Sequence, residues 1–211
     1  MQIAILLYDR FTSLDAIGPY EMLCRLPDTE TVFVAAQAGP VTNDRGSLRI
    51  IAEKTLDEVR SPDVVVVPGG PGTGDIAHDE ALTGWLRAVD ATTTWTTSVC
   101  TGSLLLAGAG LLTGRRAATH WLAYDALAAL GAEPTAERVV TDGKYLTAAG
   151  VSSGIDMGLT LVGRLAGDEY AQAVQLLTEY DPQPPYDAGS AAKAPAELVA
   201  KLRSGGHLVV K

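Results

Sequence analysis

Residues 97–108 have the sequence TSVCTGSLLLAG, in which a β-type run stops at Cys100 and an apolar helical pattern begins at once. The sequence leaves no room for a loop between the two. A residue in so tight a strand-to-helix turn takes a strained backbone conformation, and its side chain projects at the carboxyl edge of the sheet. Ligands of doubly wound sheets bind at that edge. The segment therefore predicts a functional cysteine at position 100.

The rest of the chain alternates short runs rich in Val, Ile and Thr with longer segments rich in Ala and Leu. This alternation is typical of an α/β protein, in which helices cover buried strands. The expected strands are 2–7, 31–36, 64–67, 93–98, 117–119, and 139–142 paired with 145–148. The expected helices are 13–25, 79–91, 101–109, 121–130, 153–166, 169–180 and 194–202, and a Pro-rich segment from 181 to 190 is expected to be extended.

Length and charge exclude several classes of protein. The 211 residues are enough for one substantial core, so we expect a single domain over 1–211. A net charge of −9 gives no electrostatic footprint for nucleic acid. No apolar run reaches the roughly 18 residues of a membrane span, and no signal-peptide pattern precedes the first strand. We therefore expect a cytoplasmic protein that contacts neither membrane nor nucleic acid.

The two cysteines differ in their surroundings. Cys24 lies within a helical pattern among apolar neighbours and is expected in the core, whereas the amides of the helix after Cys100 predict a stabilised thiolate and a lowered thiol pKa there. The plainer alternative for Cys100 is an inert, buried thiol. His78, His120 and His207 have no zinc-type spacing, so no metal site is expected.

Two further segments follow buried strands and fall at the same edge of the sheet. The sequence PGGPG at 68–72 is either a simple turn or a cradle, in which the amides of Gly70 and Thr101 together bind an anion. Asp15 lies in the first helical turn after the first strand. It either complements the helix dipole or exchanges protons with Cys100 or with an attacking water.

These three segments together resemble the ThiJ/PfpI superfamily, as do Thr119-His120-Trp121 and the sequence AGVSSGID at 149–156. The resemblance covers most of the chain. It implies a flavodoxin-like three-layer sandwich, with a mainly parallel central sheet, helices on both faces and a cysteine nucleophile at the strand-to-helix elbow. Within the superfamily, an Asp in the first loop and a Thr after the cysteine are similar to the isonitrile hydratase branch.

The resemblance implies a hydro-lyase that adds water to an isocyanide and releases an N-substituted formamide, through a covalent Cys100 thioimidate and without a cofactor. It assigns catalytic roles to Cys100, Asp15 and Thr101. Ile17 and Trp121 are candidate apolar walls of the substrate pocket, although an aromatic at helical spacing is more often part of the core. The full set expected to bind substrate or an oxyanion is Gly70, Ile17, His120 and Trp121.

Other activities of the superfamily remain open. Thr101 stands where the intracellular protease branch has its His, which removes the usual base of a peptidase. Asp15 stands where the glyoxalase and deglycase branch has a longer Glu. The alternatives are a glyoxalase- or deglycase-like enzyme, a redox sensor, or a ligand-sensing domain related to AraC-type regulators, which would need an added helix-turn-helix domain. Because related enzymes are commonly homodimers, we expect a homodimer acting on a small molecule.

Overall fold

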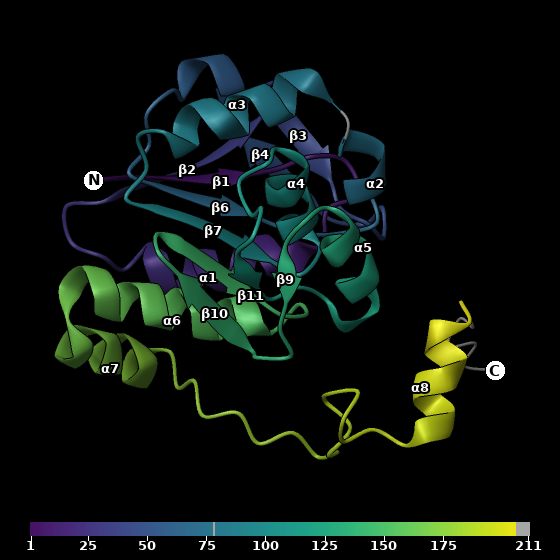
Figure 1. Cartoon of the computed structure of the whole chain (residues 1–211). Helices are drawn as coiled ribbons and strands as arrows, with labels where there is room; N and C mark the ends of the chain where they lie inside the picture. The colour runs from purple at the N-terminus through teal and green to yellow at the C-terminus, as the bar shows by residue number, and fades with distance from the viewer. Residues whose placement is uncertain (78, 206–211) are drawn as a thin grey trace.

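A seven-stranded sheet forms the centre of the computed structural model, which describes residues 1–77 and 79–205 (Figure 1). His78 and residues 206–211, including His207, lie outside the described part. The strand order is β10-β11-β7-β6-β1-β2-β5, and every neighbouring pair is parallel except β10 with β11. The strands are β1 (Gln2–Leu6), β2 (Glu30–Ala35), β5 (Lys54–Thr55), β6 (Val64–Val67), β7 (Trp95–Val99), β10 (Val139–Asp142) and β11 (Tyr145–Ala148).

Helices cover both faces of this sheet, which confirms the flavodoxin-like three-layer arrangement (Figure 1). On one face lie α1 (Ser13–Leu23), α6 (Ser153–Ala166) and α7 (Asp168–Leu177); on the other lie α2 (Thr73–Ile76), α3 (Glu80–Asp90), α4 (Gly102–Gly108) and α5 (Tyr124–Ala129). Short 3₁₀ turns occupy Leu56–Glu58 and Trp121–Ala123. Strand β6 is buried along its whole length, as expected of a continuous valine run between two helical layers. No helix within the described ranges is both long and apolar enough to cross a membrane.

The predicted strand at 117–119 is wrong. Only β8 (Arg116–Ala117) forms there, and it pairs with β9 (Glu133–Pro134) in a separate two-stranded sheet. The next two residues hydrogen-bond to the carboxyl ends of the central strands. The Ala118 amide donates to Thr147 Oγ1, and Thr119 Oγ1 donates to the Cys100 carbonyl. The segment therefore crosses the end of the sheet instead of joining it. The hairpin of β3 (Gly39–Thr42) and β4 (Arg49–Ala52) was not predicted.

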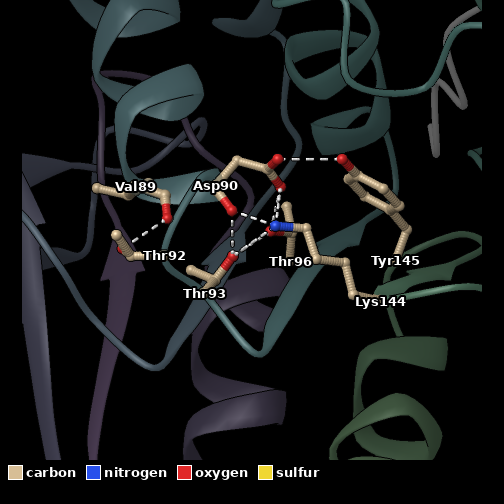
Figure 2. Close-up of polar contacts among 7 residues, drawn as sticks. All are labelled: Val89, Asp90, Thr92, Thr93, Thr96, Lys144 and Tyr145. Carbon is tan, nitrogen blue, oxygen red and sulfur yellow. Dashed lines mark hydrogen bonds and ion pairs between the residues drawn. The ribbon is translucent and has the colours of Figure 1, made fainter.

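A polar cluster lies at the edge of the sheet where the parallel strands begin, opposite the edge where they end (Figure 2). Asp90, the last residue of α3, accepts hydrogen bonds from Thr96 Oγ1 at 2.6 Å and Tyr145 Oη at 3.1 Å. Lys144 Nζ lies 3.2 Å from Asp90 Oδ1. Thr93 Oγ1 contacts Thr96 Oγ1 at 2.8 Å. The cluster thus fastens α3 to the first residues of β7 and β11.

The C-terminal segment leaves the body of the protein after Tyr180. Figure 1 shows it running away from the sheet to α8 (Ala196–Arg203). Residues 181–190 are exposed and contain no helix or strand, as their prolines predict. Helix α8 has no buried residue, so its packing within this chain is slight.

Candidate active site

The carboxyl ends of four parallel strands lie side by side at one edge of the sheet. In the order of the sheet, β11 leads to Ala149, β7 to Cys100, β6 to Pro68 and β1 to Tyr8. The connections leave β1 and β6 in opposite directions across the sheet, which makes this the switch point where doubly wound folds bind ligands. Asp15, in the first turn of α1, lies beside the same ends.

The backbone of Cys100 has the strained elbow geometry that the sequence predicts. Its φ is +59°, in the left-handed region that non-glycine residues seldom adopt. The Cys100 amide donates to the carbonyls of Ala148 at 3.1 Å and Ala149 at 2.9 Å. Its carbonyl accepts from Ser103 Oγ and Thr119 Oγ1, each at 3.1 Å. These bonds hold the main chain in place, and Cys100 is left only 5% exposed.

Glycines let the elbow approach the neighbouring turn without a gap. A Cβ atom on Gly69 would lie 2.4 Å from the Thr101 nitrogen, and one on Gly102 would lie 2.0 Å from the Val67 carbonyl oxygen. Neither position therefore has room for any side chain. The turn after β6 and the start of α4 consequently pack backbone against backbone beside the thiol.

Asp15 presents a completely buried carboxyl to this site. Its Oδ2 accepts the Gly69 amide at 2.9 Å, whereas its Oδ1 has no hydrogen-bond partner within the part of the chain that the structure describes. Burial raises the pKa of Asp15 to about 7, opposed by the Gly69 amide and by interaction with the Cys100 thiol. The negative charge of Asp44 raises this pKa further. Asp15 is therefore poised to exchange a proton near neutral pH.

The expectation of a lowered thiol pKa is wrong. Burial raises the pKa of Cys100 to about 12, and the negative charge of Asp15 acts in the same direction. The amides of Val151 and Thr101 hydrogen-bond to the sulfur and lower the pKa, but they do not outweigh burial. At neutral pH Cys100 is a thiol with a proton acceptor beside it, so its proton must leave when the sulfur attacks.

Gly70 is not free to bind an anion in the way the sequence suggested. Its amide donates to Thr101 Oγ1 at 2.9 Å, so the predicted pairing of the Gly70 and Thr101 amides does not form. Thr101 Oγ1 also contacts Thr73 Oγ1 at 2.9 Å, and Thr73 Oγ1 lies 3.1 Å from Tyr8 Oη. Tyr8 in turn donates to the Pro68 carbonyl at 2.9 Å. The Thr101 hydroxyl thus fastens the turn at 68–72 to the elbow.

Three residues at this site were not predicted from the sequence. Tyr8 and Thr73 complete the hydroxyl chain, and burial raises the pKa of Tyr8, which keeps its phenol neutral. Val151 supplies an amide to the Cys100 sulfur from a backbone with φ of +27°. The available signals were weak: a tyrosine directly after the first strand, and a glycine before Val151 in a segment otherwise typical of a helix start.

The other candidates occupy different positions. Ile17 lines a cavity of about 310 Å³ between α1, α6 and the end of α7, and Trp121 lines one of about 260 Å³ beside Arg203; Cys100 is in neither lining. The roles of Ile17 and Trp121 as walls of a substrate pocket therefore stay predictions. His120 does border the site, because a Cβ on Gly150 would lie 3.0 Å from its Cδ2.

The state of the His120 ring follows from its contacts. Nδ1 accepts the Leu122 amide at 3.3 Å, and burial lowers the pKa of the ring. The imidazole is therefore neutral near pH 7, with its proton on Nε2. It forms part of the wall behind the Gly150 turn.

Comparison with known proteins agrees with this architecture. The DJ-1/PfpI family matches residues 1–164. The chain is 44% identical over 203 residues to a Pseudomonas putida protein named isonitrile hydratase, covering 96% of this chain and 89% of that one. It is 34% identical over 143 residues to the HTH-type transcriptional regulator CdhR of Pseudomonas aeruginosa, covering 67% of this chain but 42% of the regulator.

A solved structure gives the same result. The crystal structure of a ThiJ/PfpI family protein from Pseudomonas syringae matches with a TM-score of 0.93 and 41% identity, covering 96% of this chain and 84% of that one. Fold, elbow and sequence similarity agree over most of the chain, and the protein belongs to the DJ-1/PfpI family.

Proposed function

We propose that this protein adds water to an isocyanide and releases an N-substituted formamide, as a hydro-lyase that uses Cys100 as a covalent nucleophile. The observation that carries the proposal is the buried carboxyl of Asp15, with a pKa of about 7, beside the thiol of Cys100. The 44% identity with a protein named isonitrile hydratase supports the choice of substrate class. The residues of this chain would supply every proton transfer that the reaction needs.

The first step forms a carbon–sulfur bond. The Asp15 carboxylate takes the thiol proton while the Cys100 sulfur attacks the terminal carbon of R–N≡C. The amides of Val151 and Thr101 stabilise the negative charge on sulfur as it develops. Asp15 then gives its proton to the same carbon, which leaves the thioimidate R–N=CH–S–Cys100. A covalent intermediate divides one difficult addition into two easier steps.

The second step returns the thiol. Water adds to the thioimidate carbon, losing one proton to Asp15, and the nitrogen gains a proton from the same carboxyl. The resulting adduct, R–NH–CH(OH)–S–Cys100, collapses to R–NH–CHO as the carbon–sulfur bond breaks and the sulfur recovers its proton. A general acid and base with a pKa near the working pH is suited to this alternation. Thr101 acts here by holding the turn that carries Gly69, the hydrogen-bond donor to Asp15.

The test is incubation with an alkyl or aromatic isocyanide while formamide formation is followed. We expect turnover by the unmodified protein and none by Cys100→Ala, with Cys24→Ala as the matched thiol control. Mass spectrometry of protein quenched during turnover should show an adduct of the mass of the isocyanide on Cys100. Formamide production by Cys100→Ala would disprove the covalent mechanism.

Two rival functions are tested in the same experiment. Conversion of methylglyoxal in preference to isocyanides would support a glyoxalase- or deglycase-like activity. Binding of an isocyanide without conversion would support a sensor, a possibility raised by the similarity to part of the regulator CdhR.

We further propose that residues 1–211 form one domain of a cytoplasmic homodimer that acts on a small molecule. Both cysteines are free thiols, which fits a reducing compartment. Helix α8 has no buried residue within this chain, and a second copy could pack against it. Sedimentation analysis would test the dimer, and fractionation of the source cells would test the compartment.

A further inference from the structure

Arg138 contacts both ends of the turn that presents Val151 to the thiol. The Arg138 carbonyl accepts the Ala149 amide at 2.9 Å, and Arg138 Nη2 donates to Ser152 Oγ at 3.3 Å. Gly150 and Val151 lie between these two attachments. Arg138 precedes β10 at the edge of the sheet, so it reaches the turn from outside the elbow itself.

The guanidinium of Arg138 is itself held in place. Arg138 Nε donates to Asp156 Oδ2, and Tyr180 Oη donates to Asp156 Oδ1 at 2.7 Å. Asp156 lies in the first turn of α6, directly after the Val151 turn. The clamp formed by Arg138, Asp156 and Tyr180 therefore ties the start of α6 to the edge strand and to the point where the C-terminal segment leaves the body.

The clamp is poorly placed to stabilise the fold. The side chains of Arg138 and Asp156 are 49% and 30% exposed, and ion pairs so open to solvent contribute little to folding free energy. The turn that the clamp holds, by contrast, is strained. A β-branched residue such as Val151, with φ of +27°, keeps that conformation only where its surroundings impose it.

We propose that Arg138 is a positioning residue, whose side chain acts through Ser152 and Asp156 to keep the Val151 amide directed at the Cys100 sulfur. The role deepens the proposed function, on which its catalytic meaning rests. The Ala149 peptide joins this turn to the elbow, because its amide bonds to the backbone carbonyl of Arg138, a bond that the variants below keep, and its carbonyl accepts the Cys100 amide at 2.9 Å. Displacement of this peptide would move both the elbow and the amide that stabilises negative charge on sulfur.

The charges that act on the thiol come from several elements. Asp15 faces it from α1, Tyr8 from the end of β1, and the neutral His120 lies behind Gly150. Arg138 is directed at Asp156 and Ser152, so its effect on Cys100 passes through the backbone of the turn. Removing the Arg138 side chain should therefore change thiol reactivity while the titration of Asp15 stays the same.

The test is the rate of Cys100 alkylation by iodoacetamide between pH 6 and 10, measured in a Cys24→Ala background. This readout needs no isocyanide, so it decides the proposal even if hydration is absent. Arg138→Met should slow alkylation at pH 8 by about threefold to tenfold, because the thiolate loses a well-aligned amide. Arg138→Lys keeps the charge without the forked donors, so its alkylation rate should lie between those of the parent and of Arg138→Met.

Two further comparisons make the result decisive. Tyr180→Phe should slow alkylation in the same direction by a smaller factor, and it keeps the proposal testable if Arg138→Met does not fold. Arg116→Met is the matched control, since it removes another half-exposed ion pair, with Glu137, and should leave the profile unchanged. A folded Arg138→Met protein with the parent alkylation profile would overturn the proposal. So would a slowing by Arg116→Met equal to that by Arg138→Met.

Discussion

The buried carboxyl of Asp15 lies beside Cys100 at the carboxyl edge of the sheet, and its negative charge raises the pKa of the thiol. At low pH both the carboxyl and the thiol are protonated, and neither can accept a proton. The pair becomes reactive when Asp15 ionises and can accept the thiol proton. This relationship differs from that of a preformed thiolate held by a cation. It makes the carboxyl the group that sets the pH dependence.

The rate of isocyanide hydration should rise with pH through an apparent pKa near 7, the value to which burial raises Asp15. The sign follows because only the ionised carboxyl can accept the thiol proton. Asp15→Asn should lower kcat by about 10²–10⁴-fold and remove this limb of the profile. The check is kcat/KM for both proteins from pH 5 to 9; an unchanged limb in Asp15→Asn would rule out Asp15 as the base.

Stability should respond to the same carboxyl. The pKa of Asp15 is raised from 3.8 to about 7, so the folded state binds its proton more tightly than the unfolded chain, and stability falls as pH rises between these values. Asp15→Asn should be more stable than the parent at pH 8, by on the order of 2–4 kcal/mol, and nearly equal to it at pH 4. Urea unfolding at both pH values measures the difference. Asp187→Asn, at an exposed carboxyl, is the control that should show no such effect.

Thr101→Val should weaken both folding and catalysis. The substitution keeps the shape of the side chain but leaves the partly buried Gly70 amide without its acceptor, which costs about 1–3 kcal/mol of stability. Thr101→Ser keeps the oxygen and should retain most of the stability. Thermal unfolding and kcat/KM are compared between the two variants. Equal stability and equal kcat/KM of Thr101→Val and Thr101→Ser would contradict the role assigned to the hydroxyl.

The cluster around Asp90 should affect stability alone (Figure 2). Asp90→Ala leaves Thr96, Tyr145 and the half-buried Lys144 without their shared acceptor, so it should destabilise the protein by about 2–4 kcal/mol. Tyr145→Phe removes a single bond and should cost about 1 kcal/mol. Because the cluster lies at the opposite edge of the sheet from Cys100, kcat/KM of the folded variants should equal that of the parent.

Local signals predicted the elbow and the main elements. The turn at Cys100 was predictable because strand and helix patterns meet there without a spacer, and β6, β10, β11 and α6 have the predicted bounds. The pKa of Cys100 was not predictable, because its burial and the approach of Asp15 depend on packing between segments 85 residues apart in sequence, from 15 to 100. The same reason applies to Val151, whose amide reaches the sulfur only after β7 and β11 have paired.

The Gly70 amide illustrates a different limit. The sequence correctly placed a glycine turn beside the elbow, yet it could not show that the Thr101 side chain takes the amide that an anion would need. Polar groups in a packed turn find partners within the protein, and the choice among them depends on distances of a few tenths of an ångström.

The four hydrogen bonds to the main chain of Cys100 separate the frame of the site from its reactivity. Its amide and carbonyl are satisfied by Ala148, Ala149, Ser103 and Thr119, and none of these bonds involves the sulfur. A descendant of this protein could therefore exchange the thiol, or the carboxyl facing it, while inheriting the elbow intact. On such a frame new chemistry is reached through single side-chain changes, without any redesign of the backbone that holds them.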